Sequence, residues 1–226
     1  MRYLLTFLTM ITLAACGTIS PNWTAMARWD IILLGSSGRN FCSGTVIGGG
    51  RDEVGEYAII LSAAHCANSP DYTVSRKIDF AGGIITDTKP AILLGKDAVA
   101  DVAIFRSPIS SNHTCVSLRR NVEYTRGDTV YILANPLITF YTALTKGVVS
   151  APLRVFPINT IVMYLFQIDA QAAPGSSGGA VLDADGYLIG TVTGGVPGTA
   201  ISVIAPVSGA ISLIDKLNIG EDICYG

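Results

Sequence analysis

Short β-rich runs, separated by Gly, Pro, Asn and Asp, fill most of this sequence between residues 30 and 206. Eleven such runs follow one another: DIILLG, FCSGTVIG, YAIILS, YTVSRKIDF, PAILLG, DVAIF, DTVYILA, ITFYTALTKGVVS, TIVMYLFQI, YLIGTVTG and AISVIAP. Short strands at this spacing are typical of an antiparallel barrel or sandwich, and eleven of them exceed one small barrel. An α/β protein would alternate strands with helices, so the pattern predicts an all-β fold.

One segment near the C-terminus has the periodicity of a helix. Behind a proline start, apolar residues recur at helical spacing over 206–218, at Val207, Ile211, Ile214 and Leu217. A polar stretch over 107–121, SPISSNHTCVSLRRN, interrupts the β-rich runs midway. We therefore expect two β-halves joined by this connection, with a short helix in the second half.

The N-terminus, MRYLLTFLTMITLAAC, combines a basic start at Arg2, an apolar run and small residues before Cys16. This arrangement predicts an export signal over residues 1–15. Its apolar run is roughly half of the ~20 residues that a membrane-spanning helix needs. LAAC resembles a bacterial lipobox, which implies cleavage before Cys16 and a lipid on that cysteine. An ordinary signal with an incidental cysteine is the alternative.

A lipid on Cys16 would anchor the protein to a membrane through a short polar tether, residues 16–28, facing the periplasm or the cell exterior. Thr18 is not the aspartate that lipoprotein sorting uses for inner-membrane retention, so we expect the outer membrane where the host has one. The formal net charge is −2, and the longest basic run is Arg119-Arg120. Nucleic acid is therefore not an expected partner.

Four cysteines remain besides Cys16, at Cys42, Cys66, Cys115 and Cys224. An even number in an exported chain argues for disulfides, with three possible connectivities. Four buried free thiols are the alternative, because such thiols are inert in a protein core. No Cys-x-x-Cys or Cys/His spacing suits a metal, so neither a structural zinc nor any other cofactor is expected.

The stretch AAPGSSGGAV, residues 172–181, holds two adjacent serines among glycines. A serine nucleophile needs a base, usually a histidine oriented by a carboxylate. His65 follows an apolar strand, whereas His113 lies in the polar connection and is interpreted as a surface residue. GSSGG matches the elbow of α/β-hydrolases, but there the histidine follows the nucleophile, and here both histidines precede it. A subtilisin-like order using Asp30 or Asp52 is disfavoured by the lack of helices.

The proline in this stretch distinguishes the two serines. In the Ser-His-Asp mechanism, the oxyanion is held by the backbone N–H groups of the nucleophile and of the residue two before it. With Ser177 as nucleophile, the second donor is Gly175, where a missing side chain permits the required turn. With Ser176, the second donor would be Pro174, which has no N–H. The sequence therefore predicts Ser177 as the nucleophile, with Gly175 and Ser177 forming the oxyanion hole.

Five motifs in order resemble those of the chymotrypsin-like serine peptidases, and among them the HtrA-type bacterial proteases: CSGTVIG, LSAAHC, DVAIF, GDTVYILANPL with TKGVVSAP, and DAQAAPGSSGGAVLDADGYLIGTV. The resemblance covers nearly the whole mature chain. It implies His65 as the general base and Asp101 as the orienting carboxylate. Asp97, in GKDAVADVAIF, is the rival acid, but Asp101 directly precedes the apolar strand and is preferred.

The resemblance also implies a fold of two packed antiparallel six-stranded β-barrels with a short C-terminal helix. We place the N-terminal barrel at residues 29–116 and the C-terminal barrel, with helix and tail, at 117–226. The active site would lie in the cleft between them. In the family, the positions of Cys42 and Cys66 are bridged, which leaves Cys115 to pair with Cys224.

Several positions depart from the family pattern. Ser176 stands where digestive proteases have the aspartate that pairs with a newly cut N-terminus, so activation by N-terminal insertion is not expected. Ala134 and Ala173 replace a common glycine and asparagine. We expect no PDZ-like module after the helix, so the oligomerisation and peptide sensing of HtrA-type enzymes are not carried over, and the oligomeric state stays open.

The expected function is a lipid-anchored serine endopeptidase that acts on a protein or peptide. The resemblance implies a specificity pocket with no charged lining residue, formed by Gln171, Ala173, Pro174, Thr193, Gly194 and Gly195. Such a pocket favours a small or medium apolar side chain before the scissile bond. The alternatives are a catalytically silent anchored scaffold of the same fold, whose signature would be a broken triad, and an esterase using the same machinery.

Overall fold

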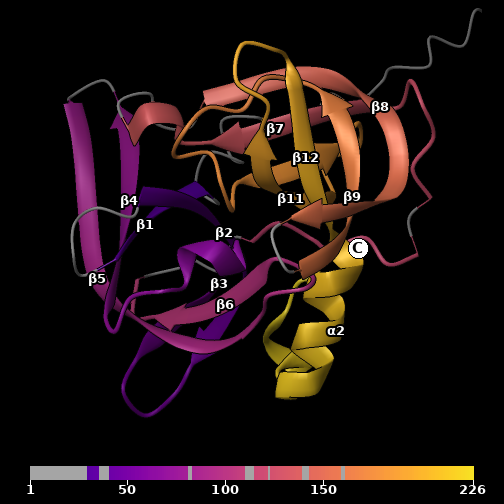
Figure 1. Ribbon diagram of the computed structural model, residues 1–226. Helices are drawn as coiled ribbons and strands as arrows, with labels where there is room; N and C mark the ends of the chain where they lie inside the picture. The colour runs from indigo at the N-terminus through magenta and orange to yellow at the C-terminus, as the bar shows by residue number, and fades with distance from the viewer. Residues whose placement is uncertain are drawn as a thin grey trace, which may run out of the picture.

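The computed structural model describes residues 30–35, 41–80, 83–109, 115–121, 123–138, 143–158 and 161–226. The predicted signal peptide, Cys16, the tether and His113 lie outside these residues. Figure 1 shows two β-barrels side by side, the first in indigo to magenta and the second in orange, with a helix beside the first and below the second. Over the described part of the chain, no helix has both the length and the apolar character to span a membrane.

The first barrel is closed and antiparallel throughout. Its strands are β1 (Asp30–Gly35), β2 (Phe41–Arg51), β3 (Glu56–Ser62), β4 (Tyr72–Phe80), β5 (Gly83–Asp97) and β6 (Val102–Ser107). They are hydrogen-bonded in the order β1-β2-β3-β6-β5-β4, and β4 returns to β1 with Ile32 opposite Ser75. Closure leaves no unpaired strand edge in the ring.

The second barrel repeats this strand order. Its strands are β7 (Thr129–Ala134), β8 (Ala143–Ile158), β9 (Ile161–Asp169), β10 (Ala180–Asp183), β11 (Leu188–Gly195) and β12 (Ile201–Pro206). They pair as β10-β11-β12-β9-β8-β7, and β7 closes the ring against β10. The first barrel thus ends at Ser107 and the second begins at Thr129, so the break falls where the polar connection was predicted.

Successive side chains along a strand point to opposite faces, and in several strands both faces pack in apolar clusters, so the sequence of the strand is a continuous apolar run. In β3, Ile60 points into the first barrel, while Ile59 and Leu61 join a cluster between the barrels. In β6, Phe105 and Ile104 divide in the same way. Both faces of β3 and β6 are buried. Their sequences therefore lack the alternation of apolar and polar residues that is typical of a sheet with one solvent-exposed face.

The helix α2 (Val207–Leu217) packs across the two barrels. Its buried residues Val207, Ala210, Leu213 and Ile214 belong to the cluster that also holds Val102 and Ile104 of β6. It begins after Pro206 and ends at Leu217, and the next residue, Asn218, has the left-handed backbone (φ 55°) that suits a helix C-cap. Figure 1 shows α2 beside β6 and below β9 and β12.

Two disulfides are present, and they join the pairs that the family resemblance implied. Cys42 of β2 is bonded to Cys66, which directly follows His65, and Cys115 of the connection is bonded to Cys224 near the C-terminus. Backbone hydrogen bonds from Cys224 to Ile47 and from Leu118 to Cys224 run beside the second bridge. The four cysteines are therefore not free thiols.

The all-β prediction is confirmed, as is the helix. The eleven predicted runs coincide with strands, and one strand was missed. This is β10, which has only four residues and directly follows the glycines of the serine-containing stretch. Strands β5 and β8 are longer than their apolar runs, because β5 continues as a paired hairpin with β4 and β8 continues with β9.

Candidate active site

His65 lies on a single turn of 3-10 helix, η2 (Ala64–Cys66), directly after β3. Its Nδ1 is 3.0 Å from both carboxylate oxygens of Asp101, and its backbone N–H donates to Asp101 Oδ1 at 3.0 Å. The carboxylate therefore fixes both the ring and its backbone, and Nε2 is left for other partners. The imidazole is about half exposed, whereas Asp101 is 1% exposed.

The structure brings Asp101, and not Asp97, to the histidine. Asp101 immediately precedes β6 and has a left-handed backbone (φ 51°), an uncommon conformation for a residue other than glycine or asparagine. Asp97 Oδ1 instead accepts the N–H groups of Val99 and Ala100, at 2.9 and 3.0 Å. The rival acid therefore stabilises a local turn in the loop before Asp101.

Ser177 lies in a loop of the second barrel, between β9 and β10. Its Oγ donates to the carbonyl of Thr193 at 3.3 Å, and within the described residues no hydrogen bond joins it to His65. Ser176 is 2% exposed, and its Oγ accepts the N–H of Ala173. The two adjacent serines thus differ in environment, because one hydroxyl is half-buried at the pocket and the other is enclosed within the loop.

The backbone of this loop leaves two donors open. The N–H groups of Ser176, Gly178 and Gly179 donate to Ala173, Val192 and Ser176 respectively. Within the described residues, the N–H groups of Gly175 and Ser177 have no protein partner. Buried or half-buried backbone donors are normally satisfied, so this pair marks a place for an external acceptor.

Two glycines permit this loop conformation. Gly175 and Gly178 have φ values of 95° and 79°, in the left-handed region that side chains disfavour. A Cβ on Gly178 would also overlap Ser62 Oγ and the carbonyl of Ser43, both in the first barrel. The loop that carries Ser177 therefore touches the first barrel at a point where only glycine fits.

A pocket of about 380 Å³ opens beside Ser177. Five of the six predicted specificity residues line it: Gln171, Ala173, Pro174, Gly194 and Gly195. Thr193 is not a lining residue, and its carbonyl instead accepts the Ser177 hydroxyl. The turn between β11 and β12 adds Val196, Pro197, Gly198 and Thr199, which the sequence did not indicate. The lining carries no charged side chain.

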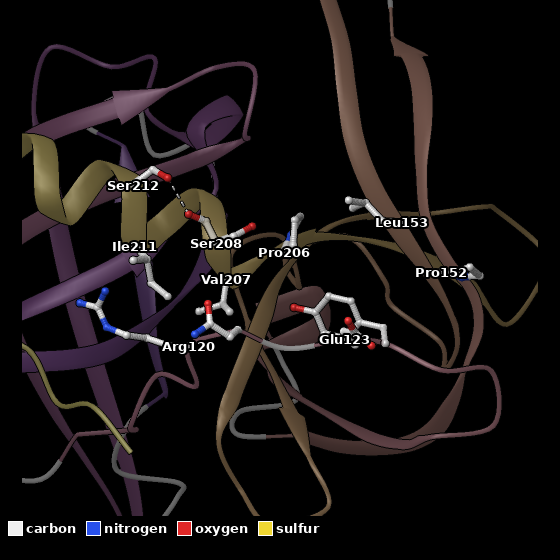
Figure 2. Close-up of a pocket in the computed structure, with 11 residues that line it drawn as sticks. Arg120, Glu123, Pro152, Leu153, Pro206, Val207, Ser208, Ile211 and Ser212 are labelled. Atoms are coloured by element: carbon white, nitrogen blue, oxygen red, sulfur yellow. Dashed lines mark hydrogen bonds between the residues drawn. The ribbon is translucent and has the colours of Figure 1, made fainter.

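A second pocket, of about 630 Å³, lies elsewhere, between α2 and β8. Figure 2 shows Ser208 and Ile211 on the first turns of α2, and Pro152 and Leu153 on the neighbouring strand. None of the predicted site residues lines it.

Cys42, His65 and Cys66 are close enough together for a metal, but both sulfurs are in the disulfide, which leaves one imidazole as a possible ligand.

One residue that contacts the loop carrying Ser177 was not among the predicted site residues. Ser43, a fully buried residue of β2, hydrogen-bonds to both Gly175 and Ser177. Its sequence signal is weak, since Ser43 is one of two buried hydroxyl residues, with Thr45, in a strand made mostly of apolar residues and glycines. The neighbouring Asn135 and Leu137 also contact this network, through their backbone N–H groups.

These features, a double β-barrel with a His-Asp pair facing a serine loop, define a trypsin-like peptidase domain. The family model described as "Trypsin-like peptidase domain" matches residues 42–190, so the chain belongs to this family.

Known proteins agree with this assignment. The chain is 30% identical over 147 residues to "Serine protease HtrA-like" of Staphylococcus aureus, an alignment that covers 61% of this chain. A protein of the same name from Staphylococcus haemolyticus is 31% identical over 115 residues, or 47% of this chain. Each alignment spans only 18% of the relative's length.

Solved structures share the fold. The serine endoprotease from Yersinia pestis superposes with a TM-score of 0.66 at 22% identity, covering 89% of this chain and 67% of that one. Rv3671c from M. tuberculosis superposes with a TM-score of 0.67 at 18% identity, covering 91% and 94%. The MamO protease domain from Magnetospirillum magneticum superposes with a TM-score of 0.63 at 17% identity, covering 84% of this chain and 97% of that one.

Proposed function

We propose that this protein is a serine endopeptidase that hydrolyses peptide bonds through an acyl-enzyme, with Ser177, His65 and Asp101 as its triad. The observation that carries the proposal is the pair of open N–H groups at Gly175 and Ser177, beside a histidine already held by a buried carboxylate. A developing oxyanion needs such preorganised donors, and a serine nucleophile needs such a base.

In this mechanism the Ser177 hydroxyl turns from the Thr193 carbonyl toward His65 Nε2. The imidazole takes the hydroxyl proton as Oγ attacks the scissile carbonyl, and the N–H groups of Gly175 and Ser177 hold the oxyanion. The C–N bond then breaks, and the imidazolium gives its proton to the leaving amine. Water repeats the sequence on the acyl-enzyme. Asp101 holds the imidazole tautomer and stabilises the imidazolium throughout.

The substrate we propose is a protein or peptide with a small or medium apolar side chain before the scissile bond. The uncharged lining of the pocket beside Ser177 supports this, since a buried Lys or Arg would find no carboxylate there. Glycines at 194, 195 and 198 add no side chains to its wall, which leaves more of the pocket open to a substrate side chain.

The esterase alternative uses the same intermediate, so only substrate comparison separates it. The silent scaffold is disfavoured by two observations. The His65 to Asp101 hydrogen bonds are intact, and no protein group occupies the two open N–H donors within the described residues.

We further propose that the enzyme works outside the cytoplasm, held to a membrane by lipid on Cys16, with the outer membrane expected in a two-membrane host. The LAAC sequence supports the anchor, and the two disulfides support an oxidising compartment. Metabolic labelling with an alkyne fatty acid tests the anchor. The wild type should incorporate it and Cys16→Ser should not; equal labelling of both would contradict the proposal.

Cleavage of a peptide library, compared with a p-nitrophenyl ester series, tests the activity. We expect peptide cleavage after Ala, Val or similar residues, absent from Ser177→Ala. Ester hydrolysis without peptide cleavage would indicate the esterase, and loss of neither activity in Ser177→Ala would contradict the triad.

A further inference from the structure

We propose that Ser43, on β2 of the first barrel, is a positioning residue that holds the oxyanion loop of the second barrel in its working geometry. The inference rests on the proposed function, because it assigns Ser43 a role in that same reaction. We call the set of hydrogen bonds described below the Ser43 clamp.

The side chain of Ser43 supplies the first part of the clamp. Its Oγ donates to the carbonyl of Gly175 at 2.8 Å and accepts the backbone N–H of Asn135 at 2.8 Å. One hydroxyl thus links the nucleophile loop to the end of β7. Ser43 is 0% exposed and Asn135 is 3% exposed, so water cannot readily replace either bond.

The backbone of Ser43 supplies the second part. Its N–H donates to the carbonyl of Ser177 at 2.8 Å, and its carbonyl accepts the hydroxyl of buried Ser62 at 2.7 Å. The two residues proposed to hold the oxyanion, Gly175 and Ser177, therefore each have their carbonyl bonded to Ser43. Both contacts cross from one barrel to the other.

Fixing these two carbonyls constrains the directions of the two open N–H groups. Gly175 has no Cβ and adopts φ 95°, so its backbone can rotate more readily than that of other residues. Without the Ser43 hydroxyl, the half-buried Gly175 carbonyl and the buried Asn135 N–H would each lose the hydrogen bond that Ser43 Oγ makes with them. Rotation of the Gly175–Ser176 peptide would relieve that cost. This peptide lies between the two peptides that carry the Gly175 and Ser177 N–H groups, so its rotation would shift both neighbours and the donors that the oxyanion needs.

The oxyanion forms only as the reaction proceeds, so misplaced donors should lower kcat and leave KM almost unchanged. Loss of a serine with only a structural role would not lower kcat while leaving KM unchanged.

Ser107 offers a matched control in the first barrel. It is also 0% exposed, and its Oγ donates to Pro90 O at 2.8 Å and accepts the N–H of Ile109. It ends β6, at the opposite end of that strand from Asp101.

The test compares Ser43→Ala with Ser107→Ala in hydrolysis of a p-nitrophenyl ester and a peptide. We expect kcat to fall about tenfold or more in Ser43→Ala, with KM within about twofold of wild type. Ser107→Ala should leave both constants within about twofold. Equal kcat in the two variants would overturn the proposal.

The amide signal of Gly175 in a ¹⁵N–¹H spectrum gives a readout that does not require activity. It should split or broaden in Ser43→Ala and stay in place in Ser107→Ala, and an unaffected signal in Ser43→Ala would overturn the clamp. If the wild type hydrolyses nothing, the proposed function fails, and this spectrum still decides whether the clamp orders the loop.

Hydrogen exchange of the wild type covers the case in which Ser43→Ala does not fold. The amides of Ser43 and Asn135 donate the two N–H bonds of the clamp. Slow exchange at both positions would support a persistent clamp, whereas exchange as fast as in the exposed turn at Gly198 would overturn it.

Discussion

The two barrels share one strand order but supply the site in different ways. The first barrel contributes side chains at strand ends, namely His65 after β3 and Asp101 before β6. The second contributes a stretch of backbone, in which Gly175 and Ser177 present open N–H groups while the N–H groups of Ser176, Gly178 and Gly179 are bonded within the protein. In the proposed mechanism, the catalytic side chains of the base and the acid thus come from one half and the backbone donors from the other.

This difference predicts that substitutions in the two barrels will affect activity in different ways. In the first barrel, one functional group can be removed while the fold stays intact, because Asp101 and His65 lie at the rim of a closed ring. In the second barrel, the working groups cannot be removed individually, because every residue except proline has an N–H. There, activity depends on residues that set the backbone path, such as Gly178 and Pro174.

The largest expected effect separates the two serines of the loop. Ser177→Ala should lower kcat/KM for peptide hydrolysis by at least about a thousandfold, since the nucleophile is lost. Ser176→Ala, which removes only a hydroxyl bonded to the Ala173 N–H, should keep most of the activity. Steady-state kinetics of both purified variants measures this. The opposite order of effects would mean that the wrong serine has been assigned.

The next effect tests the side-chain contribution of the first barrel. Asp101→Asn should lower kcat by about a hundredfold or more, because an amide no longer holds the His65 tautomer in which Nε2 accepts a proton. Asp97→Asn should lower kcat far less, since Asp97 Oδ1 accepts only the N–H groups of its own turn. Greater damage from Asp97→Asn would contradict the account.

A glycine pair tests the backbone contribution of the second barrel. Gly178 and Gly198 both have positive φ, but a Cβ on Gly198 would meet nothing within 4 Å, whereas one on Gly178 would overlap the first barrel. Gly198→Ala should lower the free energy of unfolding by about 1 kcal/mol. Gly178→Ala should lower it by more than about 3 kcal/mol. Urea unfolding measures both, and equal losses would show that the inter-barrel contact is not tight.

The smallest effect concerns the interior of the second barrel. Tyr124 stacks on Phe166 and donates its hydroxyl to Ile189 O at 2.6 Å, and burial raises the pKa of its phenol. The unfolded chain therefore loses this proton at lower pH than the folded one. Stability should fall as pH rises above about 10, the ordinary tyrosine pKa.

Tyr124→Phe should remove part of that alkaline loss, and should cost about 1 kcal/mol near neutral pH through the lost hydrogen bond. Tyr164→Phe, at an exposed position, is the control. Urea midpoints at neutral and alkaline pH measure both. The same alkaline loss in Tyr124→Phe as in wild type would contradict the role of burial.

The parts of the candidate site that could be inferred from the sequence are those that depend on local chemistry. Ser177 could be distinguished from Ser176 because Pro174 has no N–H, and His65 and Asp101 each adjoin an apolar strand. Four-residue β10 was missed because so short a run carries little periodicity. Ser43 was missed for a different reason. Its partner Gly175 lies 132 residues away, and no local pattern shows which residue of β2 will face the loop once two barrels have packed.

The most direct test of the account is labelling with a fluorophosphonate, followed by peptide mapping. The reagent needs a serine activated by a base and an oxyanion hole that accepts its phosphoryl oxygen. We predict a single adduct on Ser177 in the native protein, absent after unfolding and absent from Ser177→Ala, and strongly slowed in Asp101→Asn. An adduct on Ser176, or a native protein that does not react, would contradict the account.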